Sequence, residues 1–233
     1  MDRYYEIGRI LDEHRISRLC HMTQIDKLFS ILYGEEGIWA TAFCNSKSMY
    51  RNDMDRYDGK IEYISTSIEY PNVWYYSNKK NVNPYVNNWA VIFIDPTLSR
   101  EDKTLFCPIN SAASKGAYIS GDAKNLSASF NRQVGYRRRN SNMLYCCPTD
   151  DQAEILLYKH VSVSSITGIA FESEHTLNTM LKLFDKYSIN YPDLYLSMEL
   201  FSTGLSDLIR NGCRPREIVR EKGKRTPALV RCA

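Results

Sequence analysis

Apolar positions along the chain follow two different spacings. In residues 24–33 they recur every three or four residues, which predicts a helix with one apolar face, and residues 18–22 predict a short strand running directly into it. The same helical spacing recurs in residues 176–187 and 197–211, and an Asn-Gly pair marks the end of the second segment. A shorter helix is predicted at residues 122–130.

Further segments have the residue composition of strands. They are short, rich in β-branched and aromatic residues, and bounded by Pro, Asn, Gly or Asp. These predicted strands are residues 62–68, 89–95, 153–160 and 166–171. Helices and strands are interleaved without an internal repeat, so we expect one α+β domain whose strands share a single sheet.

The last twenty residues differ from the rest. Residues 214–233 hold seven basic and two acidic residues with little apolar periodicity. We therefore expect a domain of residues 1–212 followed by a basic, partly disordered tail of residues 213–233.

A long polar segment, residues 96–151, separates two of the predicted strands. It is rich in Asn, Ser, Gly and Arg and has weak periodicity. Compact domains rarely keep so long a loop without using it, so we expect it to serve function. The alternative is an ordinary surface excursion that carries one helix.

Composition narrows the functional classes. A hydrophobic content of 43% in 233 residues is enough for a folded core. The longest apolar runs, such as WAVIFI at 89–94, are far shorter than the roughly 20 residues of a membrane span, and no basic-then-apolar leader opens the sequence. We expect a cytoplasmic protein with no membrane partner. The seven cysteines form no CxxC pair, so we expect reduced thiols and no metal.

Glu154 stands where a polar loop enters an apolar strand. A carboxylate at such a sheet edge can keep a fixed geometry and still reach a ligand, and apolar neighbours would strengthen its charge interactions. The alternative is a solvated residue at the end of a strand.

His21 and Thr23 lie at the junction between a predicted strand and a predicted helix. Their side chains could project toward a ligand, and the nearby helix N-terminus would favour an anion. Equally, Thr23 could be the N-cap of the helix and His21 a half-buried ring.

Two basic segments could bind phosphates. The loop at residues 50–59 could present Arg51 or Arg56, although most exposed arginine loops are simply solvated. The segment 131–140, NRQVGYRRRN, combines Arg and Tyr, a combination suited to backbone phosphates and base stacking on single strands. A protein or lipid surface is another partner for it. The candidate residues here are Arg132, Tyr136, Arg137, Arg138 and Arg139.

The common motifs of phosphate loops, dinucleotide folds, metalloproteases and α/β hydrolases are missing from the sequence. Five strings, taken in order and spacing, resemble the DarT family instead. They are HMT at 21–23, NDMDRYDG at 52–59, STSIEYPN at 65–72, NSAAS at 110–114 and PTDDQAE at 148–154. The resemblance covers roughly residues 15–175.

The resemblance implies an ADP-ribosyltransferase-like domain with a mixed central sheet flanked by helices. It also implies a toxin that uses NAD to ADP-ribosylate a base, guanine or thymine, in single-stranded DNA, together with a cognate antitoxin that removes the mark. The segment at 96–151 would then be the substrate-recognition loop.

At residue level, the resemblance makes Glu154 the catalytic glutamate. It places His21, Met22 and Thr23 in the motif that holds the nicotinamide end of NAD, and Ser30 at a further NAD contact.

The loop arginine of the family best matches Arg56, which would neutralise the pyrophosphate. The resemblance also allows it to help deprotonate the target base, although arginine is a poor base at neutral pH. Met54 stands where relatives often carry a second arginine, so Arg51 is the alternative loop arginine.

Two other functions fit the same residues. The transferase could act on RNA or on a protein side chain, or the domain could be a single-strand binding module without catalysis. Consumption of NAD separates the last of these from the others.

Overall fold

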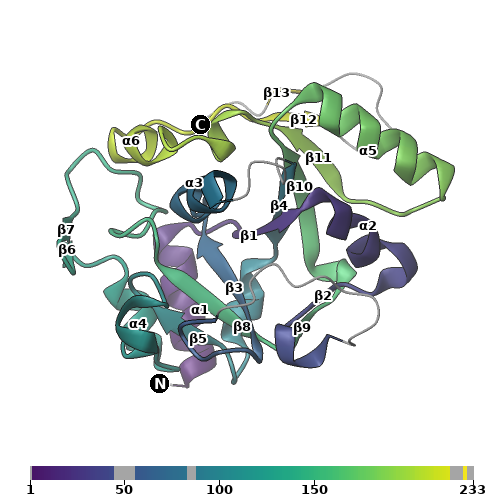
Figure 1. The fold of residues 1–233 in the computed structure, drawn as a ribbon. Coiled ribbons are helices and arrows are strands. Elements are labelled where there is room, and N and C mark those ends of the chain that lie inside the picture. Colours follow the sequence, from purple (N-terminus) through teal and green to yellow (C-terminus); the bar gives the residue numbers. More distant parts are fainter. Residues whose placement is uncertain (1, 45–55, 83–87, 221–227, 230–233) are drawn as a thin grey trace.

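The computed structural model describes residues 2–44, 56–82, 88–220 and 228–229. Its centre is a sheet in which nine described strands follow the order β13-β12-β11-β10-β4-β1-β3-β8-β5 (Figure 1). Strands β10 and β11 are parallel and the other registered neighbours are antiparallel, so the expected mixed sheet flanked by helices is confirmed.

The strands of this sheet are β1 (Leu19–Gln24), β3 (Tyr63–Ile68), β4 (Trp89–Ile94), β5 (Leu105–Cys107), β8 (Glu154–Tyr158), β10 (Ile166–Phe171), β11 (Asp193–Leu196), β12 (Ile218–Arg220) and β13 (Ala228–Leu229). Two small antiparallel pairs lie outside it: β2 (Ile38–Trp39) with β9 (His160–Val161), and the hairpin of β6 (Gln133–Val134) with β7 (Arg137–Arg138). The α-helices are α1 (Arg3–His14), α2 (Ile25–Leu32), α3 (Val73–Val82), α4 (Ala123–Ala128), α5 (Glu174–Lys186) and α6 (Leu205–Arg210).

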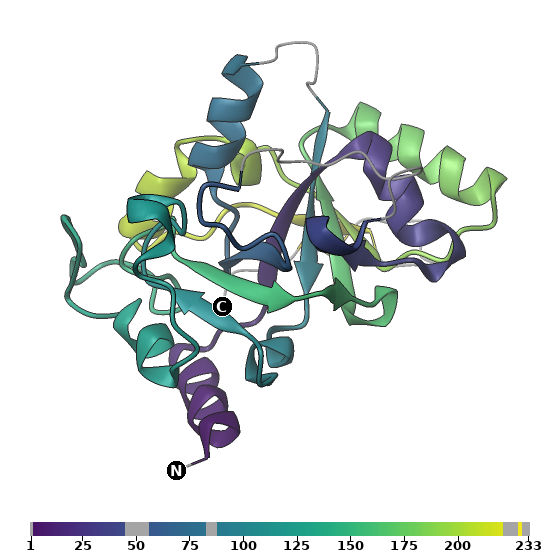
Figure 2. The same cartoon turned by 60° about the horizontal axis from the view of Figure 1, so that its bottom comes forward.

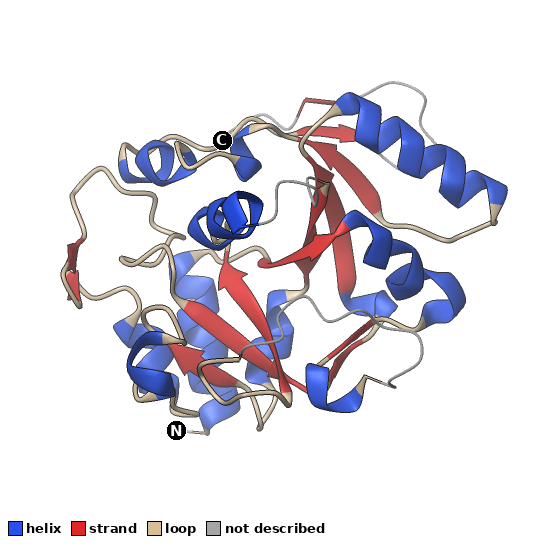
Figure 3. Cartoon of the chain, viewed as in Figure 1, coloured by secondary structure: helices blue, strands red, loops and turns tan. Residues whose placement is uncertain are grey.

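Helices cover both faces of the sheet (Figures 2 and 3). One apolar cluster contains side chains of α1, α2, α4 and α5, and a second contains side chains of α3 and α6. Strand β4 divides its residues between the two clusters, with Ile92 in the first and Val91 and Phe93 in the second. A strand buried on both faces needs a continuous apolar run, which is why residues 89–94 carry no polar side chain.

Strands β1 and β3 pair only at one end. Leu19 faces Ile68 and Cys20 faces Ser67, and beyond these residues β1 continues along β4 while β3 continues along β8. The two halves of the sheet therefore separate, and the opening exposes backbone groups of β3 that an unbroken sheet would pair. This opening positions the functional site.

Most of the predicted elements are present. The helix at 24–33 and the strands at 62–68, 89–95 and 166–171 are confirmed with boundaries shifted by at most two residues. The predicted strand at 153–160 is two strands, because Lys159 has a φ of 65° and the chain leaves β8 there to pair with β2 as β9.

One prediction was wrong for a physical reason. The helix expected at 197–211 is a short 3₁₀ turn at Glu199–Phe201 and the separate helix α6, since a Ser-Thr-Gly sequence interrupts the pattern. In the segment 96–151, the helix predicted at 122–130 is present as α4, and the segment also contains β5, the β6–β7 hairpin and 3₁₀ turns that were not predicted.

The segment that follows residue 213 contributes to the sheet. Strand β12 pairs with β11, and just before it the carboxylate of Glu217 accepts hydrogen bonds from both terminal nitrogens of Arg18, at 2.7 and 2.5 Å. The Arg18 guanidinium also lies 3.9 Å from the centre of the Phe93 ring. Residues 218–220 are thus a strand, whereas residues 221–227 and 230–233 of the expected tail lie outside the described residues.

Candidate functional site

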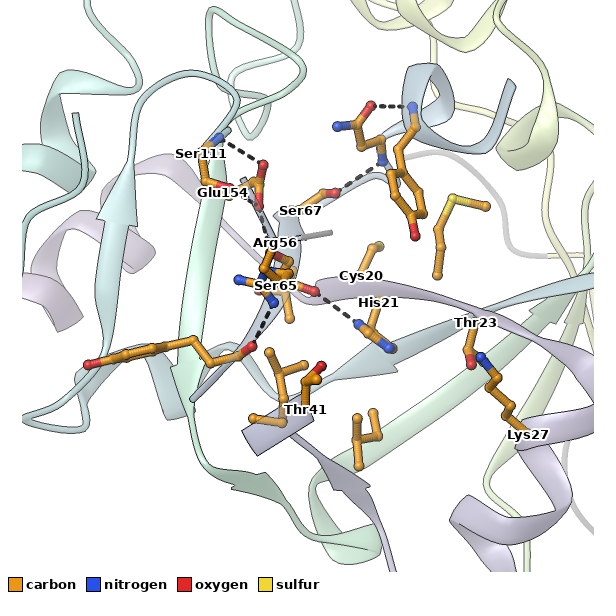
Figure 4. A pocket seen from close by; sticks show the side chains of 18 of the residues that line it. Cys20, His21, Thr23, Lys27, Thr41, Arg56, Ser65, Ser67, Ser111 and Glu154 are labelled. Carbon is orange, nitrogen blue, oxygen red and sulfur yellow. Dashed lines mark hydrogen bonds between the residues drawn. The ribbon is translucent and has the colours of Figure 1, made fainter. Parts of the chain in front are cut away.

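A cavity of about 620 Å³ occupies the opening between β1 and β3 (Figure 4). Residues from distant parts of the sequence line it, among them His21 of β1, Ser30 of α2 and Glu154 of β8. Its volume lies within the range of roughly 300–1,000 Å³ that is usual for small-molecule sites. In Figure 4, Glu154 and Ser111 lie at one end, Thr23 and Lys27 at the other, and His21 between them.

Glu154 is the first residue of β8 and is only 8% exposed. Its carboxylate accepts hydrogen bonds from Ser65 Oγ at 2.7 Å, from the Ser111 backbone N–H at 3.0 Å and from Ser111 Oγ at 3.0 Å. A solvated strand end would not be enclosed in this way. Three donors fix both carboxylate oxygens, so the group faces the cavity in one orientation.

Burial raises the pKa of Glu154 above its ordinary value, and the hydrogen bonds from Ser111 and Ser65 and the positive charge of Arg56 oppose that rise only in part. The loss of hydration is thus the largest influence on this carboxyl group. A carboxylate in so dry a place interacts strongly with any positive charge that develops nearby.

His21 bridges the gap where β1 and β3 separate. Its Nδ1 lies 2.9 Å from the Ser65 carbonyl oxygen, which can only accept, so we assign the proton to Nδ1. Burial lowers the pKa of His21, and the charges of Arg56 and Lys27 lower it further, while the bond to Ser65 opposes them. The ring is therefore neutral at pH 7, with Nε2 as a hydrogen-bond acceptor.

Arg56 is held at the wall of the cavity by three hydrogen bonds. Nε and Nη2 donate to the two carboxylate oxygens of Asp58, at 3.0 and 2.7 Å, and Nη1 donates to the Tyr63 carbonyl oxygen at 2.9 Å. Like His21, Arg56 thus pairs with a β3 carbonyl on the strand that borders the opening. Arg51 and Met54, the other positions weighed for the arginine loop, lie outside the described residues.

The remaining residues expected to contact the cofactor also line the cavity. Met22 and Thr23 belong to β1 and are buried, and Ser30 lies on α2. Thr23 is not the N-cap of α2, because β1 extends through Gln24, which occupies the cap position without a side-chain hydrogen bond. The strand instead directs this part of the chain along the cavity.

Several lining residues were not singled out in the sequence. Ser65 and Ser111 lie inside the STSIEYPN and NSAAS strings. A serine in a sequence does not indicate, however, that it will donate a hydrogen bond to a carboxylate that only the fold brings near, as both do to Glu154. Lys27 and Lys79 come from α2 and α3, and each adds a positive charge to the cavity wall. Neither lysine lies in one of the five strings, so no sequence signal marked them as site residues.

The basic residues at 132–139 do not line the cavity. They form the β6–β7 hairpin, where the Tyr136 ring is 77% exposed and the Arg137 guanidinium lies 5.2 Å from its centre. Arg132 and Arg138 are exposed, whereas Arg139 donates to the carbonyl oxygens of neighbouring residues. These acceptors are Cys147 at 2.7 Å, Leu144 at 2.8 Å and Tyr145 at 3.2 Å.

The hairpin nevertheless adjoins the site through one turn. A β-carbon placed on Gly135 would lie 3.8 Å from the side chain of Ile109, two residues before Ser111. The hairpin is therefore close to the turn whose Ser111 holds Glu154, and Arg132, Tyr136 and Arg138 remain accessible to a ligand that leaves the cavity on that side.

Among the described residues, none of the helices combines the length and apolar character of a membrane span. The same part of the chain contains no group of three or more His, Cys, Asp or Glu side chains placed to hold a metal ion.

Solved structures with the same fold include DarT proteins. Thermus sp. 2.9 DarT in complex with NAD+ has 16% identity and a TM-score of 0.56, covering 80% of this chain and 98% of that one. The same protein in complex with ADP-ribosylated ssDNA has 16% identity and a TM-score of 0.55, covering 81% and 97%. Thermosipho africanus DarTG in complex with ADP-ribose has 18% identity and a TM-score of 0.52, covering 79% and 51%.

At these identities the likeness to solved structures shows a shared fold. No curated protein matches the chain. The family model described as "ssDNA thymidine ADP-ribosyltransferase, DarT" matches residues 20–201. Because that match spans most of the sequence, including the strands and turns that enclose the cavity, the chain belongs to the DarT family of single-stranded DNA thymidine ADP-ribosyltransferases.

Proposed function

We propose that the cavity between β1 and β3 is the active site, in which this enzyme transfers ADP-ribose from NAD to thymine in single-stranded DNA. The observation that carries the proposal is the arrangement of Glu154, His21 and Arg56 around one opening in the sheet. Family membership supplies the reaction, and the description of the family favours thymine over guanine as the target base.

The residues of the cavity fit a dinucleotide. Lys27, Arg56 and Lys79 supply positive charge for two phosphates, while Ile38 and Trp39 supply apolar wall for ring systems. Met22, Thr23 and Ser30 would complete the contacts. The Thermus relative that was solved with NAD+ has the same fold, which supports this occupant.

NAD, when bound, would supply the ADP-ribose group and nicotinamide as the leaving group. Glu154 would stabilise the positive charge that develops on the ribose as the glycosidic bond breaks, because its carboxylate is fixed and poorly hydrated. His21 would offer Nε2 as an acceptor to an amide or hydroxyl group. Arg56, already paired with the Asp58 carboxylate, suits the binding of phosphate better than the removal of a proton.

The acceptor strand would leave the cavity over the turn at Ser111 and reach the β6–β7 hairpin. Exposed Tyr136 offers a face for base stacking, and Arg132 and Arg138 offer charges for phosphates. The Thermus protein solved with ADP-ribosylated ssDNA shares this fold and supports a single-stranded acceptor.

A direct experiment tests the reaction and its acceptor together. The protein is incubated with labelled NAD and, separately, with mixed single-stranded DNA, the matching RNA or a protein extract, and the products are analysed by mass spectrometry. We expect one ADP-ribose on thymine of the DNA and release of nicotinamide. Modification of guanine, RNA or protein would show that the acceptor is not thymine in DNA. Binding of DNA without consumption of NAD would show that the protein is a binding module and not a transferase.

The hairpin should govern affinity for the acceptor. Replacing Arg132, Tyr136 and Arg138 together with alanine should raise the KM for single-stranded DNA about tenfold or more, because a stacking face and two phosphate contacts are lost. The KM for NAD should change less than about twofold, because none of the three lines the cavity.

Steady-state kinetics with each substrate varied in turn measure both constants. Arg139 stays intact, since it binds backbone carbonyls within the protein, and Arg9→Ala on the exposed face of α1 is the control. Equal increases in the two KM values would show that the hairpin is not an acceptor surface.

Two biological properties are further parts of the proposal. The family resemblance suggests a toxin whose cognate antitoxin removes the ADP-ribose from DNA, and DNA as the acceptor suggests action in the cytoplasm. A gene encoded beside this one whose product reverses the modification in vitro would support the pairing.

A further inference from the structure

Asp58 is a buried carboxylate beside Arg56 and near Glu154, and the proposed reaction gives it no role of its own. It is 6% exposed. Its Oδ1 accepts hydrogen bonds from Arg56 Nε at 3.0 Å and from the Lys60 backbone N–H at 3.0 Å. Its Oδ2 accepts from Arg56 Nη2 at 2.7 Å and from Ser111 Oγ at 3.2 Å. Three N–H donors thus converge on one side chain, and the Ser111 hydroxyl lies within hydrogen-bond distance of it.

The contacts with Arg56 fix both the position and the plane of the guanidinium. A carboxylate that receives Nε and Nη2 side by side leaves that group little freedom to rotate. The bond from Nη1 to the Tyr63 carbonyl adds a third point. The Arg56 side chain is only 12% exposed, so solvent does little to loosen this arrangement.

The Ser111 hydroxyl lies between two carboxylates. Its Oγ is 3.2 Å from Asp58 Oδ2 and 3.0 Å from Glu154 Oε2, and a hydroxyl has one proton to donate. Its backbone N–H donates to Glu154 in either case. The orientation of Ser111 therefore depends on Asp58 and Glu154 together, and a single side chain joins the arginine to the catalytic glutamate.

The charge state of Asp58 agrees with this arrangement. Burial by itself would raise the pKa of Asp58, but the hydrogen bonds from Arg56, Lys60 and Ser111 and the charge of Arg56 hold it below its ordinary value. The carboxylate is therefore ionised at neutral pH and keeps the guanidinium paired.

We propose that Asp58 is a positioning residue for ADP-ribose transfer, which holds the Arg56 guanidinium at the cavity wall and couples it through the Ser111 hydroxyl to Glu154. The inference rests on the proposed function, because it assigns Asp58 an effect on transfer. A purely structural role is the competing explanation, since Asp58 also binds Lys60 N within its own turn.

A double-mutant cycle separates the two explanations. Asp58→Asn keeps the shape of the side chain but removes its charge, and it is combined with Arg56→Ala. If Asp58 acts through Arg56, Asp58→Asn should lower kcat/KM for NAD about 30-fold in the wild-type background, since slight misplacement of a group that binds the substrate is costly. In the Arg56→Ala background the further loss should be less than about threefold.

The measurement is transfer with NAD varied at saturating single-stranded DNA, with the melting temperature recorded for each variant. Asp58→Ser repeats the cycle if the asparagine variant does not fold. Asp102→Asn, the same change on an exposed carboxylate, is the matched control. Losses that multiply across the cycle, or a kcat/KM for NAD of Asp58→Asn within about threefold of wild type, would overturn the proposal.

Failure of the proposed function gives a different pattern. If the wild-type protein transfers no ADP-ribose to DNA, that function fails and this inference with it. If the wild type transfers and Glu154→Gln does not, while the Asp58 cycle shows independent losses, only the role of Asp58 is wrong.

Discussion

Replacing Glu154 with glutamine should lower kcat for ADP-ribose transfer by about 10³-fold while the Kd for NAD changes less than about threefold. The amide keeps the size of the side chain but loses the negative charge that opposes a developing positive charge on the ribose. The loss is expected to be large because Glu154 is only 8% exposed, so water screens the interaction of its carboxylate little.

Single-turnover transfer measures the chemical step, and calorimetry measures the affinity for NAD. Glu101→Gln, on an exposed turn, makes the same chemical change away from the cavity and should retain wild-type activity. Normal transfer by Glu154→Gln would remove the carboxylate from the mechanism.

As the pH is lowered, the wild-type enzyme should begin to lose activity at a higher pH than it would if Glu154 had the pKa of an ordinary glutamate. Burial raises the pKa of Glu154 above its ordinary value, so its proton returns earlier as the pH falls and the required carboxylate is lost. A profile of kcat/KM between about pH 4 and 8 should show this acidic limb displaced upward. A limb centred at or below the ordinary value would contradict the assignment, provided that melting curves show folded protein throughout.

Replacing Arg56 with alanine should lower kcat/KM for NAD by about 10²-fold, because a fixed positive charge is removed from the cavity wall. Arg56→Lys should recover only part of this loss. A lysine keeps the charge but lacks the planar fork that binds Asp58 through two nitrogens and the Tyr63 carbonyl through a third.

The same assay with Arg9→Ala controls for removal of an arginine, since Arg9 lies on the exposed side of α1. A kcat/KM for Arg56→Lys equal to that of the wild type would show that only the charge matters at position 56. An alanine variant with unchanged kcat/KM would place the phosphates elsewhere, with Lys27 and Lys79 as the remaining cations of the described cavity wall.

The sequence was informative about the site where short strings kept their order. His21, Thr23, Arg56 and Glu154 were all identified as candidates, and the structure places them around one cavity. What the sequence could not supply is the set of partners that hold them. Ser65 meets Glu154 only because β3 and β8 pair, at a separation of 89 residues, and no local pattern records such a contact.

The elements of the fold were likewise predicted only in part. Segments with strong apolar periodicity, such as those of α2 and β10, were predicted nearly residue for residue. Helix α3 was missed because aromatic residues dominate Val73–Val82 and its apolar positions form no clear stripe. Helix α1 lies in a segment whose tyrosines and charges obscured the four buried residues of its inner face. Strand β12 was missed because it is only three residues long and sits among basic residues.

The pairing of Arg18 with Glu217 joins residues 199 positions apart. During synthesis, a ribosome would have made almost the entire described domain before the guanidinium at the start of β1 could meet its carboxylate. Until then the buried guanidinium of Arg18 would have the Glu69 carbonyl oxygen and two aromatic rings as close partners but would lack its directly bonded carboxylate, which is unfavourable. The nascent polypeptide should therefore complete the β1 side of the cavity only after translation has passed this glutamate.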